Sequence, residues 1–356
     1  MNEILPGSRL DIWLKILAEK GASDLHAGAH RPASMRISGE LSPLDDVVVT
    51  AEQMEDISRE LTPEHRKEEL AQLGSCDFSF SHDKDRYRAS IFKQRGTFSM
   101  VLRRLPQDRL TFEQLGAPPV LKALAQLPRG MILVTGPTGS GKTTTLTALI
   151  HEINVMRPDH ILTLEDPIEF FHESIKSVVT QREIGSDTTD FSEALRRALR
   201  QDPDVILLGE MRDLETTSAA ITAAETGHLV MGTLHTTGAA RTMDRIIDQY
   251  PTHQQDQVRS QLAVSVQAVV SQVLLPKVGG GRIAAFEIMI RNSAIENHIR
   301  KGETFKITSV MQTQKRLGMQ LLDDHLIELT KAGQITPETA LGAAQMPGDL
   351  RQRLGV

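Results

Sequence analysis

The sequence has few of the residues on which several classes of protein depend. Among its 356 residues there is one cysteine, Cys76, and aromatic residues make up 4% of the chain. A single thiol excludes an internal disulfide and any zinc site built from several cysteines, and it suits the reducing cytoplasm. Few aromatic side chains leave little surface on which nucleobases could stack, which argues against a nucleic-acid translocase and against nucleic acid as a partner.

Long hydrophobic runs and an excess of positive charge are also missing. The N-terminal stretch "MNEILPGSRLDIW" does not have the basic start and apolar segment of a signal peptide. The best candidate for a membrane span, "LAVSVQAVVSQVLL" (262–275), is too short and contains serine and glutamine. The net charge of −6 argues against broad electrostatic binding to nucleic acid or to an acidic membrane. We therefore expect membrane association only peripherally, through partner proteins.

Two regions with different hydrophobic patterns divide the chain. Residues 1–104 contain a helix with apolar residues on one face, a capping-box helix start at Thr50, and the alternating segments "CDFSFS", "YRASIF" and "TFSMVLRRL", which together predict a small α+β domain. Residues 105–119 have no clear period and end in Pro-Pro, which predicts a linker. In residues 120–356 short apolar strands alternate with helices, which predicts a parallel α/β sheet followed by a helical C-terminal part.

A phosphate-binding loop is predicted between the first of these strands and the next helix. The segment "GPTGSGKTTT" fits the pattern G-x-x-x-x-G-K-[ST], and its glycines allow the backbone to wrap closely around phosphates. We expect Lys142 to reach the β- and γ-phosphates of a nucleotide and the Thr143 hydroxyl to bind Mg²⁺. The expected nucleotide-binding residues are Gly136, Pro137, Thr138, Gly139, Ser140, Gly141, Lys142, Thr143 and Thr144.

Two glutamates follow predicted strands at the end where a nucleotide should lie. In an open α/β sheet, ligands bind outside the carboxyl ends of parallel strands. Glu210 follows "DVILLG" and Glu165 follows "HILTL", whereas Asp204 begins its strand and should lie at the far end. We assign Glu210 to the Mg²⁺ shell, directly or through water, and Glu165 to the attacking water, and the two assignments could be exchanged.

Two histidines, His228 and His235, flank another predicted strand in "TGHLVMGTLHTT". Residues seven apart in a strand lie roughly 23 Å apart, so one metal ion cannot bind both. His235 follows the strand and is expected to sense the γ-phosphate or to order the catalytic loop. His228 opens the strand at the far end, where a structural histidine is at least as good an interpretation.

Taken together, these segments resemble one family of proteins. "GPTGSGKTT", "ILTLEDPIEF", "DPDVILLGEMRD" and "TAAETGHLVMGTLHTT" are similar to the Walker A motif, Asp box, Walker B motif and His box of the secretion and type IV pilus motor ATPases, and most of all to the PilT-like retraction ATPases. The "SDLH" segment at Ser23–His26 is also similar. The resemblance implies a RecA-like P-loop ATPase domain preceded by a PAS-like α+β N-terminal domain. It further implies a homo-hexamer that hydrolyses ATP with Mg²⁺ to power pilus retraction and twitching motility.

The resemblance also implies further site residues and partners. Similar spacing in the family supplies arginines from the N-terminal domain to the ATP site, which selects Arg88 and Arg103, fifteen residues apart, with Arg104 as the alternative. A guanidinium can neutralise charge that develops on the γ-phosphate. The expected partners are an inner-membrane pilus platform protein and other pilus motor ATPases, which places the protein in the cytoplasm at the inner-membrane base of the pilus machine.

One departure from the family pattern leaves alternatives open. Retraction ATPases carry a C-terminal helix resembling A-I-R-N-L-I-R, whereas this chain has "AIENHIR", with Glu296 and His298 at the changed positions. The change is compatible with an accessory PilU-like paralogue instead of the main motor. A type IV secretion ATPase is a second alternative, and a nucleotide-dependent regulatory scaffold that hardly hydrolyses ATP is a third.

Overall fold

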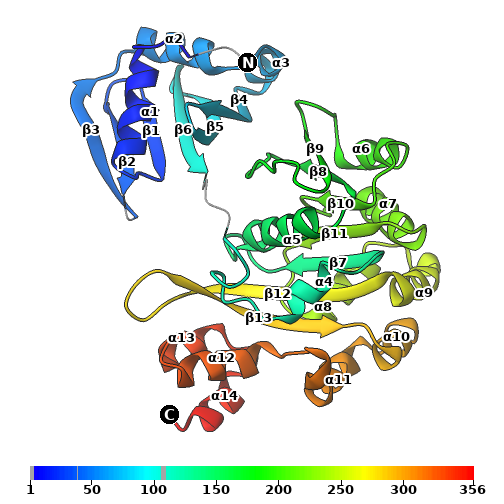
Figure 1. Cartoon of the computed structure of the whole chain (residues 1–356). Coiled ribbons are helices and arrows are strands. Elements are labelled where there is room, and N and C mark those ends of the chain that lie inside the picture. Colours follow the sequence, from blue (N-terminus) through cyan, green and yellow to red (C-terminus); the bar gives the residue numbers. More distant parts are fainter. Residues whose placement is uncertain (1–3, 38, 106–109) are drawn as a thin grey trace. The chain divides into compact units, whose positions relative to one another are not determined.

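The computed structural model describes residues 4–37, 39–105 and 110–356 and divides the chain into two compact units (Figure 1). Unit 1 comprises Met1–Asp108 with Pro167–Phe170, and unit 2 comprises Arg109–Asp166 with Phe171–Val356. Of the linker predicted at residues 105–119, residues 106–109 lie outside the described residues. The part after residue 109 belongs to unit 2, where the Phe112 side chain is buried against its core.

Unit 1 contains, in its described residues, a six-stranded antiparallel sheet in the order β3-β2-β1-β6-β5-β4. Its strands are β1 (Asp24–Gly28), β2 (Pro32–Ile37), β3 (Glu40–Val48), β4 (Ser75–His82), β5 (Asp85–Gln94) and β6 (Thr97–Leu105). Its helices are α1 (Arg9–Glu19), α2 (Ala51–Leu61) and α3 (Glu64–Leu73). The predicted α+β fold and strands β4 to β6 are confirmed, whereas β1 to β3 and α3 were not predicted.

The first two helices of unit 1 were both predicted, and the second begins at the predicted capping box. The apolar face of α1, which includes Trp13, is buried in the core of the unit. At the start of α2, the Thr50 hydroxyl accepts a hydrogen bond from the Gln53 N–H at 3.2 Å, and the Gln53 side chain accepts one from the Thr50 N–H at 3.0 Å. This capping box satisfies two N–H groups that the helix itself cannot bond.

Unit 2 contains, in the part of the chain that the structure describes, a seven-stranded sheet in the order β13-β12-β7-β11-β10-β8-β9. Neighbouring strands are parallel except for β13, which pairs antiparallel with β12. The predicted parallel sheet is thereby confirmed, and β12 and β13 form a hairpin that turns at "GGG". Strand β9 was not predicted. The strands are β7 (Gly130–Thr135), β8 (His160–Glu165), β9 (Val178–Glu183), β10 (Val205–Leu208), β11 (Leu229–Leu234), β12 (Val266–Pro276) and β13 (Arg282–Ile290).

Helices cover both faces of the unit 2 sheet. One face packs against α4 (Val120–Leu124) and α5 (Lys142–Met156). The other face packs against α6 (Phe191–Ala198), α7 (Leu214–Glu225), α8 (Ala239–Ile247), α9 (Gln255–Ser265), α10 (Ser293–Arg300) and α11 (Ile307–Thr313). Short 3₁₀ helices are η1 (Thr252–Gln254), η2 (Thr304–Lys306) and η3 (Lys315–Leu317). Among the described residues, none of the helices combines the length and the apolar character needed to span a lipid bilayer.

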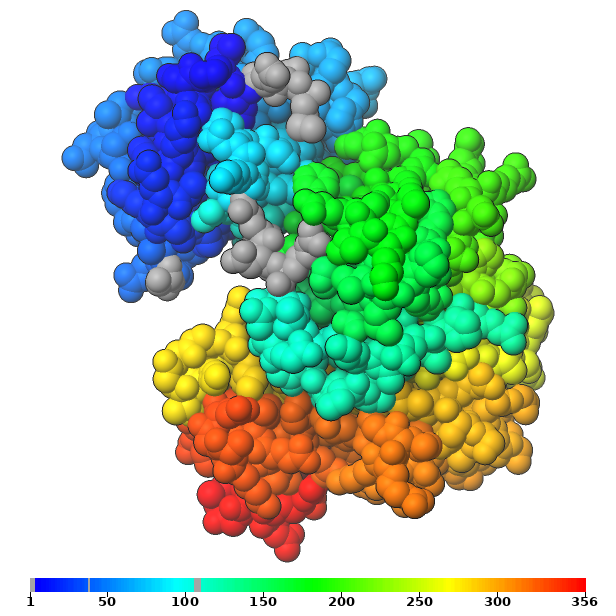
Figure 2. Space-filling view, in the orientation of Figure 1, coloured from blue at the N-terminus to red at the C-terminus, as the bar shows by residue number. Residues whose placement is uncertain are grey.

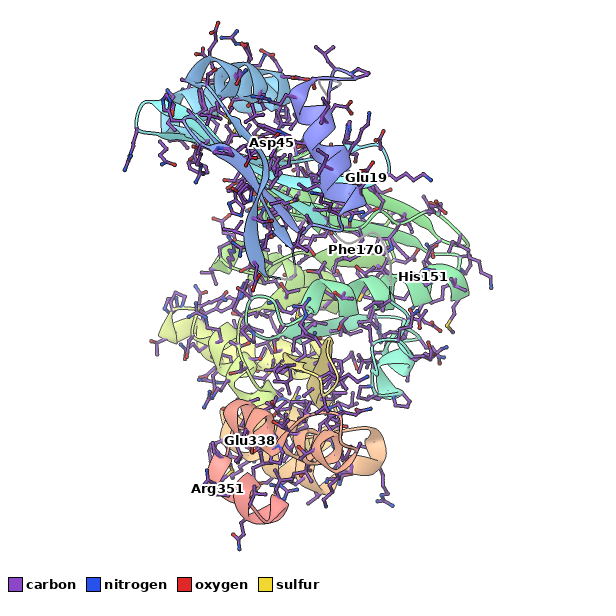
Figure 3. All side chains as sticks on the ribbon, turned by 90° about the vertical axis from the view of Figure 1, so that its left-hand side faces the viewer. Glu19, Asp45, His151, Phe170, Glu338 and Arg351 are labelled. Carbon is purple, nitrogen blue, oxygen red and sulfur yellow. The ribbon has the colours of Figure 1, made fainter. Side chains whose placement is uncertain are left out.

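The last three helices pack against the β12–β13 hairpin. They are α12 (Leu322–Lys331), α13 (Pro337–Ala343) and α14 (Pro347–Leu354), and their apolar residues share a core with Leu275 of β12 and Ala285 of β13. Figure 2 shows these orange and red residues gathered at one end of unit 2. In Figure 3, Glu338 marks α13 and Arg351 marks α14, while His151 marks α5 beside the phosphate loop.

The two residues that depart from the family pattern in α10 both have partners nearby. The Glu296 carboxylate lies 3.2 Å from a guanidinium nitrogen of Arg291 and 2.6 Å from one of Arg300. His298 Nδ1 lies 3.1 Å from a carboxylate oxygen of Glu303. The changed charge of this helix is therefore compensated by contacts within unit 2.

Candidate active site

The parallel register of the central strands places the predicted site residues at one edge of the sheet. Leu234 at the end of β11 lies beside Thr135 at the end of β7. Leu208 at the end of β10 lies between Gly232 of β11 and Leu164 of β8. The carboxyl ends of these strands therefore lie side by side. Gly136, Glu210 and His235 follow their strands there, and Glu165 is the last residue of β8.

The phosphate loop connects β7 with α5, which begins at Lys142. Its three glycines all have positive φ, 143° at Gly136, 78° at Gly139 and 89° at Gly141, a backbone region that other residues rarely adopt. Lys142 Nζ donates hydrogen bonds to the carbonyls of Gly136 at 2.8 Å and Pro137 at 3.1 Å. The lysine thus lies along the loop, and the first turn of α5 supplies N–H groups and a positive dipole end suited to phosphate.

Gly136 is required for a second reason, which is its closeness to β12. A β-carbon at Gly136 would lie 2.2 Å from the backbone carbonyl oxygen of Gln272 and 2.6 Å from the hydroxyl of Ser140. The Gln272 side chain is buried and bonds to the loop at Ser140 and to α5 at Thr145. Gln272 was not predicted as a site residue, because no motif connects it with a loop more than a hundred residues earlier.

Glu210 and His235, both predicted site residues, are brought together by the strand register. His235 Nε2 lies 2.9 Å from Glu210 Oε1, and a guanidinium nitrogen of Arg212 lies 2.7 Å from Glu210 Oε2. Burial by itself would raise the pKa of Glu210, but the hydrogen bond and charge of Arg212, with those of His235, hold this pKa below its usual value. Glu210 is therefore held as a carboxylate, the form that a cation or an N–H donor binds.

Glu165 occupies a different environment from Glu210. It ends β8, and its side chain is buried. Its Oε1 accepts hydrogen bonds from the Thr163 hydroxyl at 2.7 Å and from the Gln181 side chain of β9 at 3.1 Å. These two donors help to fix the orientation of the carboxylate.

The loop that carries His235 is held by β12 and β13. The Gly238 N–H donates to the Ser271 hydroxyl at 2.9 Å, and the Ala239 N–H donates to Glu287 Oε1 at 2.8 Å. Burial raises the pKa of Glu287. The contacts hold the segment between His235 and α8 at a fixed distance from the sheet. Ser271 and Glu287 were not predicted, although "FEIMI" does contain an acid within an apolar strand, which is a signal for a buried carboxylate.

His228 lies at the opposite end of β11 from His235, so the two histidines do not meet. Its backbone N–H donates to the Ala223 carbonyl at 3.2 Å, and its Nδ1 lies 2.9 Å from the same oxygen. His228 therefore closes the turn between α7 and β11, away from the phosphate loop.

Arg88 and Arg103 lie in unit 1, directly opposite each other on β5 and β6. Both are exposed, and Arg103 Nε donates to Asp24 Oδ1 at 2.8 Å. Burial by itself would raise the pKa of Asp24, but the hydrogen bond from Arg103 and that from Ser23 lower it. Arg104 alternates to the other face of the strand and lies 2.9 Å from Asp85. Asp24 belongs to the "SDLH" segment, which thus has a structural role as the anchor of Arg103.

The site residues fit Mg²⁺ by their chemistry. The Thr143 hydroxyl is in the first turn of α5, and the ionised Glu210 is at the same edge of the sheet. Mg²⁺ prefers oxygen ligands and is usually held by one or two protein groups together with substrate phosphates and water. A hydroxyl and a carboxylate beside a phosphate loop are such a set.

Comparison with known proteins identifies close relatives. The family model "Type II/IV secretion system protein" matches residues 19–320. The chain is 47% identical over 335 residues, covering 94% of its length and 97% of the relative, to the type IV pilus retraction ATPase PilT of Pseudomonas aeruginosa. It is 39% identical over 340 residues, with 95% and 89% coverage, to the type IV pilus ATPase PilU of the same organism. A crystal structure of the pilus retraction motor PilT with bound ADP matches with a TM-score of 0.91 at 44% identity, covering 96% of this chain and 99% of that one. This likeness confirms the predicted RecA-like ATPase fold.

Substitution of the two histidines is expected to have unequal effects. His235→Ala removes the imidazole beside Glu210 and should lower kcat for ATP hydrolysis by about 100-fold, the usual effect of losing one positioned polar group from an active site. His228→Ala removes a turn contact and should lower the melting temperature while kcat stays close to that of the wild type. Steady-state phosphate release and thermal unfolding measure the two effects. An equal loss of turnover in both variants, with assembly unaffected, would contradict this division.

Substitution of Arg212 is expected to change the pH dependence of hydrolysis. Arg212 lowers the pKa of Glu210, so Arg212→Ala should raise that pKa, and Glu210 should become protonated at a higher pH. The acid limb of the pH profile of kcat/KM should therefore move to higher pH. Arg196→Ala, which removes an exposed arginine of α6, is the matched control and should leave the limb in place. An unchanged acid limb in Arg212→Ala would show that Glu210 ionisation does not limit the reaction.

Proposed function

The chain belongs to the type II/IV secretion system protein family and is an ATPase, and we propose that it is the motor that powers type IV pilus retraction by hydrolysing ATP. The observation that carries the chemistry is the meeting of the phosphate loop, Glu165, Glu210 and His235 at one edge of a parallel sheet. Identity of 47% to a retraction ATPase over almost the whole chain supports the biological assignment.

ATP binds with its phosphates against the loop between β7 and α5. Lys142, which lies within reach of the loop carbonyls, turns to the β- and γ-phosphates, and the N–H groups of the loop and of the first turn of α5 bond their oxygens. Thr143 and Glu210 would hold Mg²⁺, which neutralises charge on the β- and γ-phosphates.

The different surroundings of the two glutamates support separate roles. The Arg212 guanidinium beside Glu210 helps to hold it ionised, which suits a group in the metal shell and makes it a weak base. Glu165 is buried at the same edge of the sheet, and Thr163 and Gln181 orient its Oε1, which supports its assignment to the attacking water. His235 lies beside Glu210, where it can contact the γ-phosphate. When hydrolysis removes that phosphate, the loss of this contact would change the segment between His235 and α8.

The exposed arginines of unit 1 supply positive charge for the reaction. Arg88 and Arg103 form a pair of cations on one face of the sheet, and Asp24 fixes the second of them. Our proposal is that they neutralise charge developing on the γ-phosphate in a homo-hexamer. The ring works in the cytoplasm at the inner-membrane base of the pilus machine, where a platform protein and other pilus motor ATPases are its partners.

The main retraction motor is favoured over an accessory paralogue. Identity is 47% to the retraction ATPase and 39% to the pilus ATPase PilU over similar lengths. Glu296 pairs with Arg291 and Arg300, and His298 Nδ1 lies 3.1 Å from Glu303, so both residues have partners within unit 2. Lys142, Glu165 and Glu210 are all at the site edge, which argues against a regulatory scaffold without turnover. A type IV secretion ATPase would use the same chemistry and is distinguished by the process that stops when the gene is lost.

Removal of the unit 1 arginines is expected to stop hydrolysis without stopping binding. Arg88→Ala and Arg103→Ala should each lower kcat of the assembled protein by about 100-fold or more, as loss of a cation at a developing phosphate charge does. The affinity for fluorescent ADP should stay near the wild-type value. Lys93→Ala, an exposed cation of the same strand β5, serves as the control. Wild-type turnover in both arginine variants would exclude this role.

Deletion of the gene tests the function of the whole protein. The deletion strain should carry abundant surface pili, counted by electron microscopy, and should not twitch. The wild-type gene should restore twitching, whereas Lys142→Ala, which cannot bind the phosphates, should not. Normal twitching in the deletion strain would refute the main-motor assignment. A purified assembly without Mg²⁺-dependent phosphate release would support the scaffold instead.

A further inference from the structure

Strand β12 lies directly beside the phosphate loop although the two are far apart in the sequence. It runs parallel to β7, and the last pair in their register joins Ser271 to Thr135. The next residue of each strand is Gln272 on one side and Gly136 on the other. Gln272 is therefore level with the first residue of the loop, and it is 1% exposed.

The side-chain amide of Gln272 bonds to both sides of the loop. Its Nε2 donates to the Ser140 carbonyl oxygen at 2.6 Å, and its Oε1 accepts from the Thr145 hydroxyl at 2.8 Å. The amide is buried, and these two bonds give both its oxygen and its nitrogen a partner, as buried polar atoms require. A carboxylate in this place would have no donor for Ser140, and a hydrocarbon would leave the Ser140 carbonyl and the Thr145 hydroxyl without this partner.

These bonds determine the direction of one N–H group of the loop. In a trans peptide the C=O bond of one residue and the N–H bond of the next lie in one plane and point in opposite directions. Because Gln272 holds the Ser140 carbonyl toward β12, the Gly141 N–H is directed away from β12. The positive φ of Gly141 allows the chain to enter α5 directly afterwards. Thr145, whose N–H bonds to the Gly141 carbonyl at 3.1 Å, holds the first turn of the helix to the same amide.

Gln272 also limits how closely the loop can approach β12. Its carbonyl oxygen would be 2.2 Å from a β-carbon at Gly136, and its Nε2 would be 3.0 Å from one at Gly141. The loop therefore contacts Gln272 at its first glycine, at Ser140 and at its last glycine. These contacts prevent it from moving closer to β12.

We infer that Gln272 is a positioning residue of the nucleotide site, which directs the Gly141 N–H of the phosphate loop toward a bound phosphate through its bonds to Ser140 and Thr145. The inference rests on the proposed function in that it concerns the same nucleotide site. Gln272 does not act as a catalytic residue, because its contacts are with the loop and with α5. A buried glutamine that only stabilised the fold would make the protein less stable when replaced, with the same affinity for nucleotide in the molecules that remain folded.

Two substitutions at Gln272 separate the two bonds. Gln272→Met keeps the length of the side chain and loses both bonds, whereas Gln272→Glu keeps an acceptor for Thr145 and places a second acceptor against the Ser140 carbonyl. The matched control is Gln267→Met, at the other end of the same strand, where the side chain lies beside Gly130. The affinity for fluorescent ADP, the KM for ATP, kcat and the melting temperature are measured for each full-length protein.

Both Gln272 variants should raise the Kd for ADP and the KM for ATP by about tenfold, because the buried Ser140 carbonyl loses its hydrogen-bond donor. Gln272→Glu should have the larger effect, and Gln267→Met should have none. Wild-type Kd and KM in both Gln272 variants would overturn the inference, as would equal changes in the Gln267 control.

Thr145→Val provides an independent test if a Gln272 variant does not fold. It removes the hydroxyl that bonds Oε1 and should raise Kd on its own, and in combination with Gln272→Met it should add little, because the same bond is already lost. Full additivity would show that the two side chains do not act together. Failure of the proposed function is a separate result: the wild type would then release no phosphate, while the Kd for ADP would still report on Gln272.

Discussion

A β-carbon at Gly136 would lie 2.2 Å from the backbone carbonyl of Gln272, so the chain can leave β7 beside β12 only through glycine. This close approach brings the phosphate loop against a buried amide that bonds it at Ser140 and at the start of α5. The affinity of such a loop depends on where its N–H groups point, because each of them must meet a phosphate oxygen. Strand packing and nucleotide binding are thus set by the same contact.

The second feature of the site is the contrast between its two glutamates. Glu210 lies between Arg212 and His235, which hold it ionised, and Glu165 is oriented by the neutral groups of Thr163 and Gln181. Two carboxylates at one sheet edge can take different parts in phosphoryl transfer when their surroundings differ in this way.

Much of the nucleotide site was predictable because its determinants are local. A glycine-rich segment between an apolar strand and a helix identifies a phosphate loop, and parallel strands place the residues that follow them at one edge. The same rule separated His235 from His228, which lie at opposite ends of β11. The capping box at Thr50 and the apolar face of α1 are local in the same sense. Strands β1 to β3 and β9 were not predicted, because short or half-exposed strands have a weak alternation of apolar and polar residues.

By itself the sequence determined the glycine-rich loop between a strand and a helix, the parallel sheet, and the edge of that sheet at which Glu165, Glu210 and His235 lie, since hydrophobic period and glycine conformation act over a few residues. Only the tertiary structure decided which residues, distant in the sequence, position the loop and the arginine of the site. Gln272 bonds to Thr145, which is 127 residues away in the sequence, and to Ser140, which is 132 residues away. Asp24 bonds to Arg103, which is 79 residues away. Such contacts depend on the register between strands, which is set by packing of the whole sheet and leaves no periodic trace in the chain.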